Sequence, residues 1–323
     1  MSLAAIEARR AAARTGAAGL AVPAGAQGPG PIAGGLVEAL DLVIARRAAG
    51  VLPGERRAAG LGAGTELAQL RPYQVGDDVR RLDASASART GIPHVRDHVP
   101  ERTLTTWIVL DVSASMAWGT AARLKSDVAE GVAHVVGRLA VRRAGRVALV
   151  TCGAPEVRLL APGAGRTALV ALRRALAAGV APDGRPPAPD ALARTLRRVA
   201  LLARGPGLVV VISDFREGAP GDGRPAWARA LGVLAARHDV LAVEVADPRE
   251  AQLPDVGHLV LVDPETGARA EADTSSEGLR RRFAAAELAR RDEVAAALRR
   301  VRARHVVVST DGDWLRNLGR SLR

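Results

Sequence analysis

A short apolar run that ends in an acidic residue constrains the fold of this chain more than any other feature. Residues 107–110 are apolar, mostly β-branched or leucine, without a polar interruption. Such a run is typical of a strand buried on both faces of a parallel sheet. Asp111 follows at once, and hydroxyls stand at the alternate positions Ser113 and Ser115. Because open α/β sheets bind ligands outside the carboxyl ends of their strands, these oxygens are candidates for a site.

Apolar strands alternate with amphipathic helices along the rest of the chain. We predict further strands at 146–152, 156–160, 208–213, 240–245 and 306–309, and helices at 124–139, 167–178, 190–203, 227–237 and 279–302. A hairpin is expected around Asp263-Pro-Glu-Thr-Gly267, and Asp313 is expected to cap a short final helix that starts at Trp314. This order predicts an α/β fold with a doubly wound, mostly parallel sheet and a smaller N-terminal segment.

The N-terminal third of the chain has a different composition. Residues 1–32 are rich in Ala, Gly and Pro, and we expect a mobile tail there. Residues 33–103, with a helical pattern at 36–47 and a glycine-rich turn at 60–64, are predicted to form the N-terminal segment, and residues 104–323 the α/β domain. A polar block at 71–83 surrounds Tyr73. Its pattern fits a solvated loop with surface ion pairs as well as a functional segment.

Charge and cysteine usage limit the function classes. The formal net charge is +12, and Lys125 is the only lysine among 46 basic residues, which indicates codon bias as much as a selected basic surface. No arginine cluster is interleaved with aromatic residues, so nucleic-acid binding is a secondary alternative.

Cys152, the single cysteine, lies in a predicted strand and is expected to be a buried, inert thiol in a reducing compartment. With no long apolar run and no secretory signal, we expect a cytoplasmic protein.

A second apolar strand, at 208–213, also ends in an acidic residue, Asp214. If the two strands are neighbours, Asp111, Ser113, Ser115 and Asp214 reach one crevice. Their oxygens are hard donors of the kind that Mg²⁺ prefers, and water would complete the octahedron. The set therefore predicts a site for Mg²⁺ or another divalent cation, with a position left for an acidic side chain of a partner.

Two other interpretations use the same residues. In a purely structural one, the hydroxyls satisfy backbone groups at the following turn and helix, and the aspartates make surface contacts. In an enzymatic one, Asp111 is the nucleophile of a metal-assisted phosphohydrolase, although position 113 is Ser where such enzymes have a second Asp. Lys125 lies inside a predicted helix and not after a glycine-rich loop, and no zinc-protease or hydrolase motif is present, so we expect a protein that is not an enzyme.

Several motifs together resemble a known family. Residues from about 36 to 323 resemble the domain-of-unknown-function 58 family, bacterial proteins built on a von Willebrand factor A-like domain. The motifs that carry the resemblance are Arg71-Pro-Tyr-Gln-Val-Gly-Asp-Asp-Val-Arg-Arg-Leu-Asp83, Ser87-Ala-Arg89, Val95-Arg96, Leu110-Asp-Val-Ser-Ala-Ser-Met116 with Lys125 downstream, and Thr310-Asp-Gly-Asp-Trp314.

The resemblance implies a function. It assigns Asp111, Ser113 and Ser115 to the first motif of a metal-ion-dependent adhesion site, and Asp214 to its later aspartate. It also implies a partnership with a MoxR-type AAA+ ATPase in the maturation or assembly of client proteins. Two positions depart from the family pattern: Ala84 stands where a Trp is usual, and the loop at 186–190 has no threonine. We therefore expect an interaction adaptor that docks a partner at a degenerate adhesion site.

Overall fold

The computed structural model describes residues 28–30, 32, 66–99, 104–142, 144–181, 187–217 and 225–322. The chain divides into two compact units, one within Arg47–Thr103 and the other formed by the remaining residues, and each is described by itself. The predicted helix at 36–47, the turn at 60–64 and most of the predicted tail lie outside the described residues.

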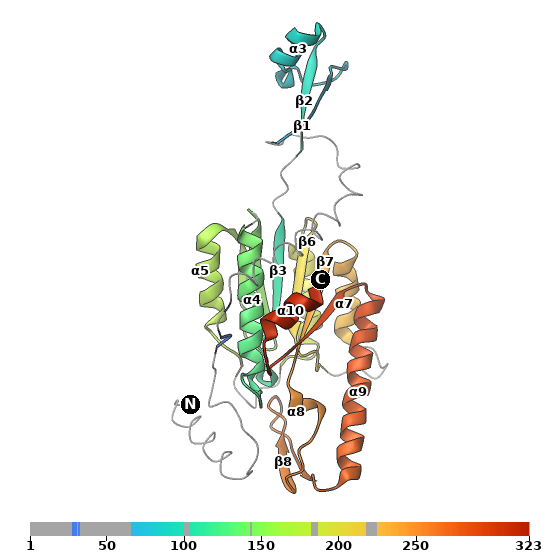
Figure 1. The fold of residues 1–323 in the computed structure, drawn as a ribbon. Helices are drawn as coiled ribbons and strands as arrows, with labels where there is room; N and C mark the ends of the chain where they lie inside the picture. The colour runs from blue at the N-terminus through green and yellow to red at the C-terminus, as the bar shows by residue number, and fades with distance from the viewer. Residues whose placement is uncertain are drawn as a thin grey trace. The chain divides into compact units, whose positions relative to one another are not determined.

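The large unit is built on a six-stranded sheet with the strand order β10-β7-β6-β3-β4-β5 (Figure 1). Every neighbouring pair is parallel except β4 and β5, so the predicted doubly wound, mostly parallel sheet is confirmed. The strands are β3 (Thr105–Asp111), β4 (Arg146–Cys152), β5 (Leu159–Ala164), β6 (Gly207–Ser213), β7 (Asp239–Ala246) and β10 (Arg304–Ser309).

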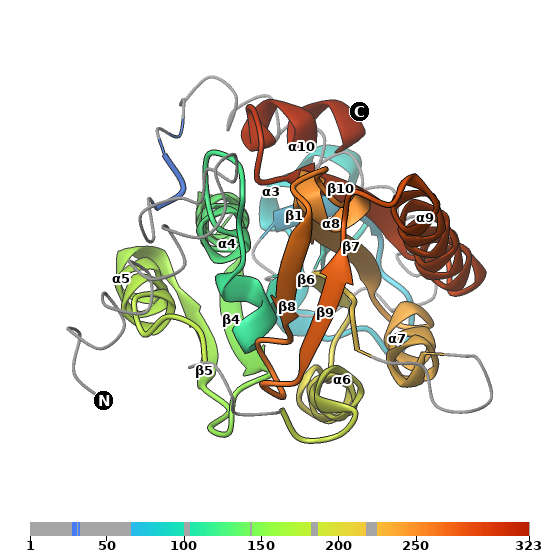
Figure 2. The same ribbon diagram turned by 90° about the horizontal axis from the view of Figure 1, so that it is seen from below.

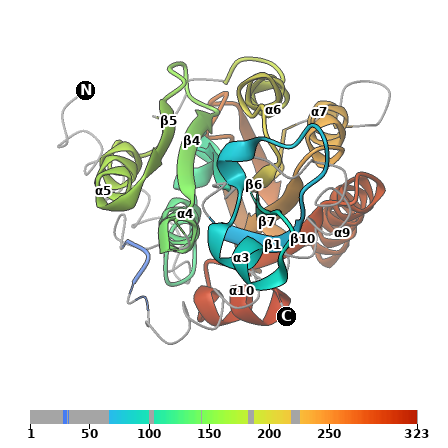
Figure 3. The ribbon, with the colours of Figure 1, turned by 90° about the horizontal axis from the view of Figure 1, so that it is seen from above.

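Helices cover both faces of this sheet (Figure 3). One face carries α4 (Lys125–Arg142), α5 (Gly165–Leu176) and α10 (Trp314–Leu322). The other carries α6 (Ala191–Leu202), α7 (Ala226–Ala235) and α9 (Glu277–Arg300). Among the described helices, none combines the length and the apolar character that a membrane span requires.

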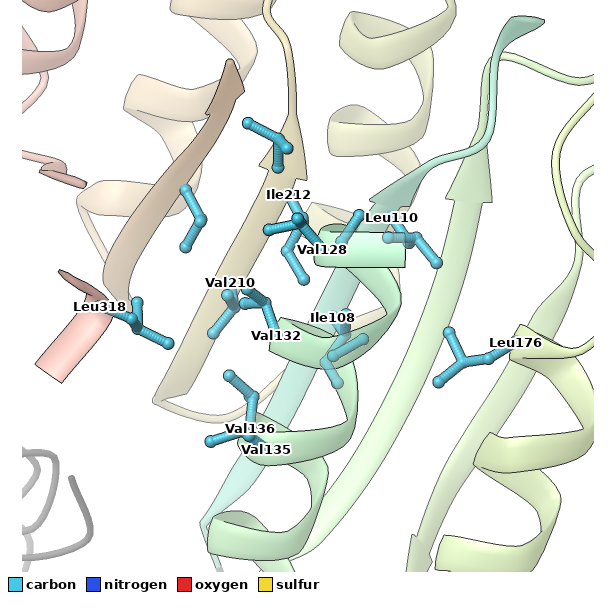
Figure 4. Packing of buried hydrophobic residues seen from close by; sticks show 14 of the residues in the cluster. Ile108, Leu110, Val128, Val132, Val135, Val136, Leu176, Val210, Ile212 and Leu318 are labelled. Atoms are coloured by element: carbon cyan, nitrogen blue, oxygen red, sulfur yellow. The ribbon is translucent and has the colours of Figure 1, made fainter. Parts of the chain in front are cut away.

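The central strand β3 contributes to both layers of the core, as its continuous apolar run predicts. Successive side chains of a strand point to opposite faces, so Ile108 and Leu110 pack in one core cluster while Trp107 and Val109 pack in the other. On the first face the valines of α4 lie over β3 and β6 (Figure 4). These residues are Val128, Val132, Val135 and Val136 above Ile108, Leu110, Val210 and Ile212.

The edge strand β5 differs from the prediction. The sequence places it at 156–160, but it begins at Leu159 and continues through Pro162 to Ala164. The chain bends at 153–156 first, and the backbone N–H of Arg158 donates to the hydroxyl of Thr151. Proline is tolerated here because β5 lies at the edge of the sheet, where one side of the strand needs no ladder donor.

The remaining elements of the large unit lie beyond the sheet. β8 (His258–Val262) and β9 (Arg269–Asp273) form the predicted hairpin as a separate two-stranded antiparallel sheet. It follows the short helix α8 (Pro248–Ala251), whose N-cap is Asp247. The carboxylate of Asp313 accepts a hydrogen bond from the backbone N–H of Arg316 at 2.9 Å, which confirms the predicted cap of α10.

The small unit contains β1 (Glu66–Pro72), β2 (His94–Val99) and α3 (Ala84–Thr90). The two strands pair antiparallel, so the polar block at 71–83 is not simply a loop but joins a strand to a helix. Asp83 caps α3 and also binds Arg96 at 2.7 Å. Asp77 binds Arg71 at 2.7 Å, and that hydrogen bond lowers the pKa of Asp77 to about 2.

We expect Leu172→Ala to lower the free energy of unfolding by about 2–5 kcal/mol, since the fully buried side chain fills the space over Gly137 and its loss leaves a cavity. Val170→Ala, on the same helix but 41% exposed, is the control and should change stability by less than about 0.5 kcal/mol. Urea titrations of both variants measure the difference, and equal effects would contradict the described packing of α5.

Candidate functional site

The register of the central strands brings the predicted site residues together. Leu110 of β3 is paired with Ile212 of β6, so the residues that follow, Asp111 and Ser213, lie side by side. The hydroxyl of Ser213 donates to Asp111 Oδ2 at 2.6 Å. Across the same edge, the hydroxyl of Ser115 donates to Asp214 Oδ2 at 3.0 Å and lies 3.0 Å from the hydroxyl of Ser113.

The two serine hydroxyls do not serve the local backbone. Ser113 is the N-cap of the 3-10 turn Ala114–Ala117, yet its side chain makes no capping hydrogen bond. Instead its backbone N–H donates to Asp111 Oδ1 at 3.0 Å, and its hydroxyl faces Ser115. The hydroxyl part of the structural interpretation is therefore wrong, although Asp111 does make one backbone contact.

Lys125 joins the cluster, which the sequence interpretation did not foresee. Its side chain is completely buried, and Nζ lies 2.7 Å from Asp214 Oδ2 and 2.6 Å from Glu250 Oε1. Glu250 is held in turn by Arg216 at 3.2 Å and by the backbone N–H of Asp247. A buried charge requires such partners, because removal from water costs several kcal/mol per ion.

The pKa values of Asp111 and Asp214 shift in opposite directions. Burial would raise the pKa of Asp214, but the charge and hydrogen bond of Lys125 outweigh it and the pKa is lowered. Burial also opposes the charge of Lys125, yet the adjacent Asp214 and Glu250 raise its pKa. For Asp111, burial and then the negative charge of Asp214 raise the pKa, and the hydrogen bond from Ser213 only partly compensates. Of these two aspartates, Asp111 is therefore the one whose ionised form is disfavoured by its surroundings.

A small pocket lies beside Asp111. Its volume is about 20 Å³, enough for about one water molecule or a monatomic ion. Gly153 lines it with a φ of +83°, and a Cβ there would lie 2.7 Å from Asp111 Oδ1 and from the backbone nitrogen of Ser113. The absence of a side chain at this position thus keeps the pocket open. The lining residues are Asp111, Ser113, Cys152, Gly153, Pro187, Leu192, Ser213, Asp214, Glu217 and Glu265.

Two glutamates, Glu217 and Glu265, add further carboxyl groups to the pocket lining. Glu217 accepts a hydrogen bond from the backbone N–H of Leu192 through Oε1, while the buried Oε2 has no partner. Burial, helped by the charge of Asp111, raises the pKa of Glu217 to about 7. Burial and then the charges of Asp214 and Asp111 raise the pKa of Glu265. The pocket therefore carries more carboxyl groups than the single ammonium of Lys125 neutralises.

The chemistry of this donor set suits a hard divalent cation. Two carboxylates and two hydroxyls are the oxygen ligands that Mg²⁺ prefers, and water would fill the remaining positions. Among the described residues, however, no group of three or more His, Cys, Asp or Glu side chains is arranged to hold a metal ion. The serine hydroxyls of Ser113 and Ser115 would therefore have to be ligands.

The side of the pocket where the adhesion-site threonine is expected is apolar. Pro187 and Leu192 lie there, and residues 182–186 of the same loop are outside the described residues. Cys152, also in the lining, is 2% exposed, and burial raises the pKa of its thiol well above the usual value. The prediction that Cys152 is buried is confirmed.

Sequence reasoning missed Lys125, Gly153, Ser213, Glu217 and Glu265 as members of the site. For Lys125 the sequence did offer an indication, because it is the single lysine in an arginine-rich chain. Ser213 immediately precedes Asp214 and could have been found once the two strands were assumed to be neighbours. Glu265 could not, because it lies 154 positions after Asp111 in a different sheet (265 minus 111).

The fold and the pocket define a class: a doubly wound α/β domain with a polar pocket at the carboxyl edge of its mostly parallel sheet. The chain belongs to the family described as "Protein of unknown function DUF58", whose model matches residues 69–294.

Two mycobacterial relatives and one solved structure are similar to this chain. The chain is 39% identical over 286 residues to uncharacterized protein Rv1480 of Mycobacterium tuberculosis, which covers 87% of this chain and 86% of the relative. Uncharacterized protein MAV169 of Mycobacterium avium is 42% identical over 134 residues, or 42% of this chain and 71% of the relative. The solved structure of conserved hypothetical protein BatB from Bacteroides thetaiotaomicron aligns with a TM-score of 0.40 and 14% identity, covering 68% of this chain and 97% of that chain.

We expect Lys125→Met to lower the free energy of unfolding by about 3–5 kcal/mol, because it leaves Asp214 buried without its counter-charge. The double variant Lys125→Met/Asp214→Asn should recover part of that loss, since no unpaired charge remains at this position. Arg138→Met, at an exposed position of the same helix, is the control. Chemical denaturation of these three variants and of the single variant Asp214→Asn completes the comparison, and strictly additive single effects would show that the pair is not coupled.

Glu217 should make stability depend on pH. Its pKa in the folded protein, about 7, lies above its ordinary value of 4.5, so the folded state binds the proton more tightly than the unfolded state. Its contribution is complete below pH 4.5 and is lost as the pH rises through 7. Relative to Glu217→Gln, the wild type should lose about 2 kcal/mol over this range, allowing for partial solvent screening. Thermal unfolding between pH 4.5 and 8 tests this, with the exposed Glu271→Gln as the control that should follow the wild type.

Proposed function

We propose that this protein is a non-enzymatic adaptor that docks a protein partner at the pocket formed by Asp111, Ser113, Ser115 and Asp214. The single observation that carries the proposal is the convergence of these residues, from two neighbouring strands and the turn after β3, in one hydrogen-bonded cluster. Asp111, Glu217 and Glu265 are each only half-buried, so the lining extends to the protein surface where a partner can reach it.

The partner we propose is a MoxR-type AAA+ ATPase that acts on client proteins during their maturation or assembly. Membership of the DUF58 family supports this partnership through the resemblance described for the sequence. The one free, buried thiol fits a reducing compartment, and we place the adaptor in the cytoplasm.

Mg²⁺ or another divalent cation is part of the proposal. Asp111 and Asp214 with the hydroxyls of Ser113 and Ser115 would hold it, and the cation would supply a hard acceptor for an oxygen ligand. Other residues of the chain hold these ligands in position. Lys125 keeps Asp214 ionised and fixed, Ser213 orients Asp111, and Gly153 leaves the space beside the carboxylate free.

A binding role suits the geometry of Asp111 better than a nucleophilic one. Oδ1 accepts the backbone N–H of Ser113 and Oδ2 accepts the hydroxyl of Ser213, so both oxygens are engaged by donors. Such bonds orient a carboxylate but reduce its reactivity toward an electrophile. No comparable observation favours the phosphohydrolase or the nucleic-acid-binding alternative.

Asp111→Asn should weaken binding to the MoxR-type ATPase encoded nearest to the gene by at least about tenfold, the effect expected for a central interface residue. Removal of divalent cations with EDTA should weaken it as well. Binding of the purified full-length proteins can be measured by biolayer interferometry, with Asp292→Ala, an exposed aspartate of α9, as the control that should bind normally.

The outcomes separate the parts of the proposal. Unchanged affinity for Asp111→Asn would refute docking at this pocket. Loss of binding by Asp111→Asn with no effect of EDTA would refute the cation and leave the docking site in place. The unfolding midpoint of each variant shows whether it is folded.

A further inference from the structure

A short N-terminal stretch binds to α4 and α10 of the large unit. The described residues of this stretch, which we call the strap, are Gly28, Pro29, Gly30 and Ile32. Viewed from below, the strap, drawn in blue, lies beside α4 (Figure 2). The indole N–H of Trp314 on α10 donates to the carbonyl of Pro29 at 2.9 Å, although the two residues are 285 positions apart. None of these residues lines the docking pocket, so the contact is independent of that site.

Two buried polar side chains bind backbone groups of the strap. The carboxylate of Asp127 on α4 accepts the backbone N–H of Gly28 through Oδ1 at 3.0 Å, while its Oδ2 accepts the backbone N–H of Leu124 at 3.0 Å. Asp127 is 2% exposed and Trp314 is 3% exposed. The donor on α10 and the acceptor on α4 are therefore fixed by their surroundings, and together they hold the backbone of the consecutive residues Gly28 and Pro29.

The strap conformation requires glycine and proline at particular positions. Gly28 has a φ of +67° and Gly30 a φ of +74°, values that residues with a side chain rarely adopt. A Cβ at Gly30 would also overlap the guanidinium of Arg123. Pro29 has a φ fixed by its ring, so it loses little conformational freedom when it binds. The segment that this surface accepts therefore has the sequence Gly-Pro-Gly.

The surface beneath Pro29 is shaped by a glycine of α4. A Cβ at Gly131 would lie 2.7 Å from Cβ of Pro29 and 2.5 Å from Cζ2 of Trp314. Glycine inside a helix is less favourable than alanine, and here its presence is explained by the space that it leaves for the two rings. Ile32 then packs against the core cluster to which both α4 and α10 contribute. We call Asp127, Gly131 and Trp314 the strap site.

We propose that the strap site is a recognition site for a Gly-Pro-Gly peptide segment, and that the strap is its ligand within the same chain. Docking of proline-containing segments on aromatic side chains is a recurring mode of peptide recognition. The strap is a displaceable clamp that holds the first turn of α10 to α4. Because a tethered ligand acts at an effective concentration of order millimolar, two hydrogen bonds and one proline contact are enough to keep it bound.

Hydrogen exchange of the full-length protein tests the contact. The chain has 4 tryptophans, and the indole N–H signal of Trp314 in a nitrogen-15 NMR spectrum is assigned by its loss in Trp314→Phe. In the double variant Pro29→Ser/Ile32→Ser, this indole proton should exchange with solvent about tenfold faster than in the wild type, as expected for the loss of one hydrogen bond. Pro93→Ser, an exposed proline of the small unit, is the control and should leave the rate unchanged. Wild-type exchange in the double variant would overturn the proposal.

A peptide added to the double variant distinguishes a recognition site from a packing contact. A synthetic peptide with the sequence of residues 26–34, Ala-Gln-Gly-Pro-Gly-Pro-Ile-Ala-Gly, should restore the slow exchange of the Trp314 indole at a concentration of order millimolar. The same peptide carrying Pro29→Ser should have no effect. If the first peptide does not restore slow exchange, or if both peptides act equally, Gly-Pro-Gly recognition at this surface is refuted.

A methyl group added to α4 tests the space beneath Pro29. Gly131→Ala should release the strap as the double variant does, and the peptide should not restore slow exchange, because its proline meets the methyl. Gly319→Ala on α10, where a Cβ would meet nothing within 4 Å, is the matched control and should exchange as the wild type does. Thermal unfolding establishes that each variant is folded. Restoration by the peptide in Gly131→Ala would contradict the assigned site.

Light scattering determines which copy of the chain supplies the strap. A strap bound within its own chain predicts the same molar mass for the wild type and for Pro29→Ser/Ile32→Ser. A wild-type dimer that dissociates in the double variant would overturn the assignment to the same chain, because the strap would then be exchanged between two copies.

Discussion

The buried ion pair between Lys125 and Asp214 is the interaction on which the rest of the site depends. Parallel pairing of β3 and β6 places Asp111 and Asp214 at one edge of the sheet, in surroundings where two carboxylates repel each other strongly. Lys125, at the first turn of α4, removes that conflict for Asp214 and ties the helix to the strand. Burial and the charge of Asp214 disfavour the ionised form of Asp111, so the two carboxylates at this edge differ in their electrostatic surroundings.

The ion pairs continue from this pocket through the protein. Glu250 links Lys125 to Arg216, and Arg216 binds Glu287 of α9 at 2.9 Å. Glu287 also forms ion pairs with Arg290 and Arg291. Arg290 forms a further ion pair with Glu244, whose carboxylate lies 2.8 Å from the imidazole of His305 on β10. Several arginines are thus used inside the protein to balance buried acids. The net charge of +12 is accordingly not a measure of a basic binding surface.

The sequence by itself determined the architecture and half of the site. The apolar run at 208–213 and the helical spacing of apolar residues in α4 both mark side chains that become buried. Burial depends on the polarity of each side chain and on how often apolar residues recur, and a single sequence contains both kinds of information. Asp111, Ser113, Ser115 and Asp214 could be predicted because they lie at or shortly after the ends of recognisable strands. Tertiary structure decided the partners of these residues, including Lys125 and Ser213. Register, the path of the hairpin and the pairing of buried charges depend on contacts between distant segments, and no local pattern records them.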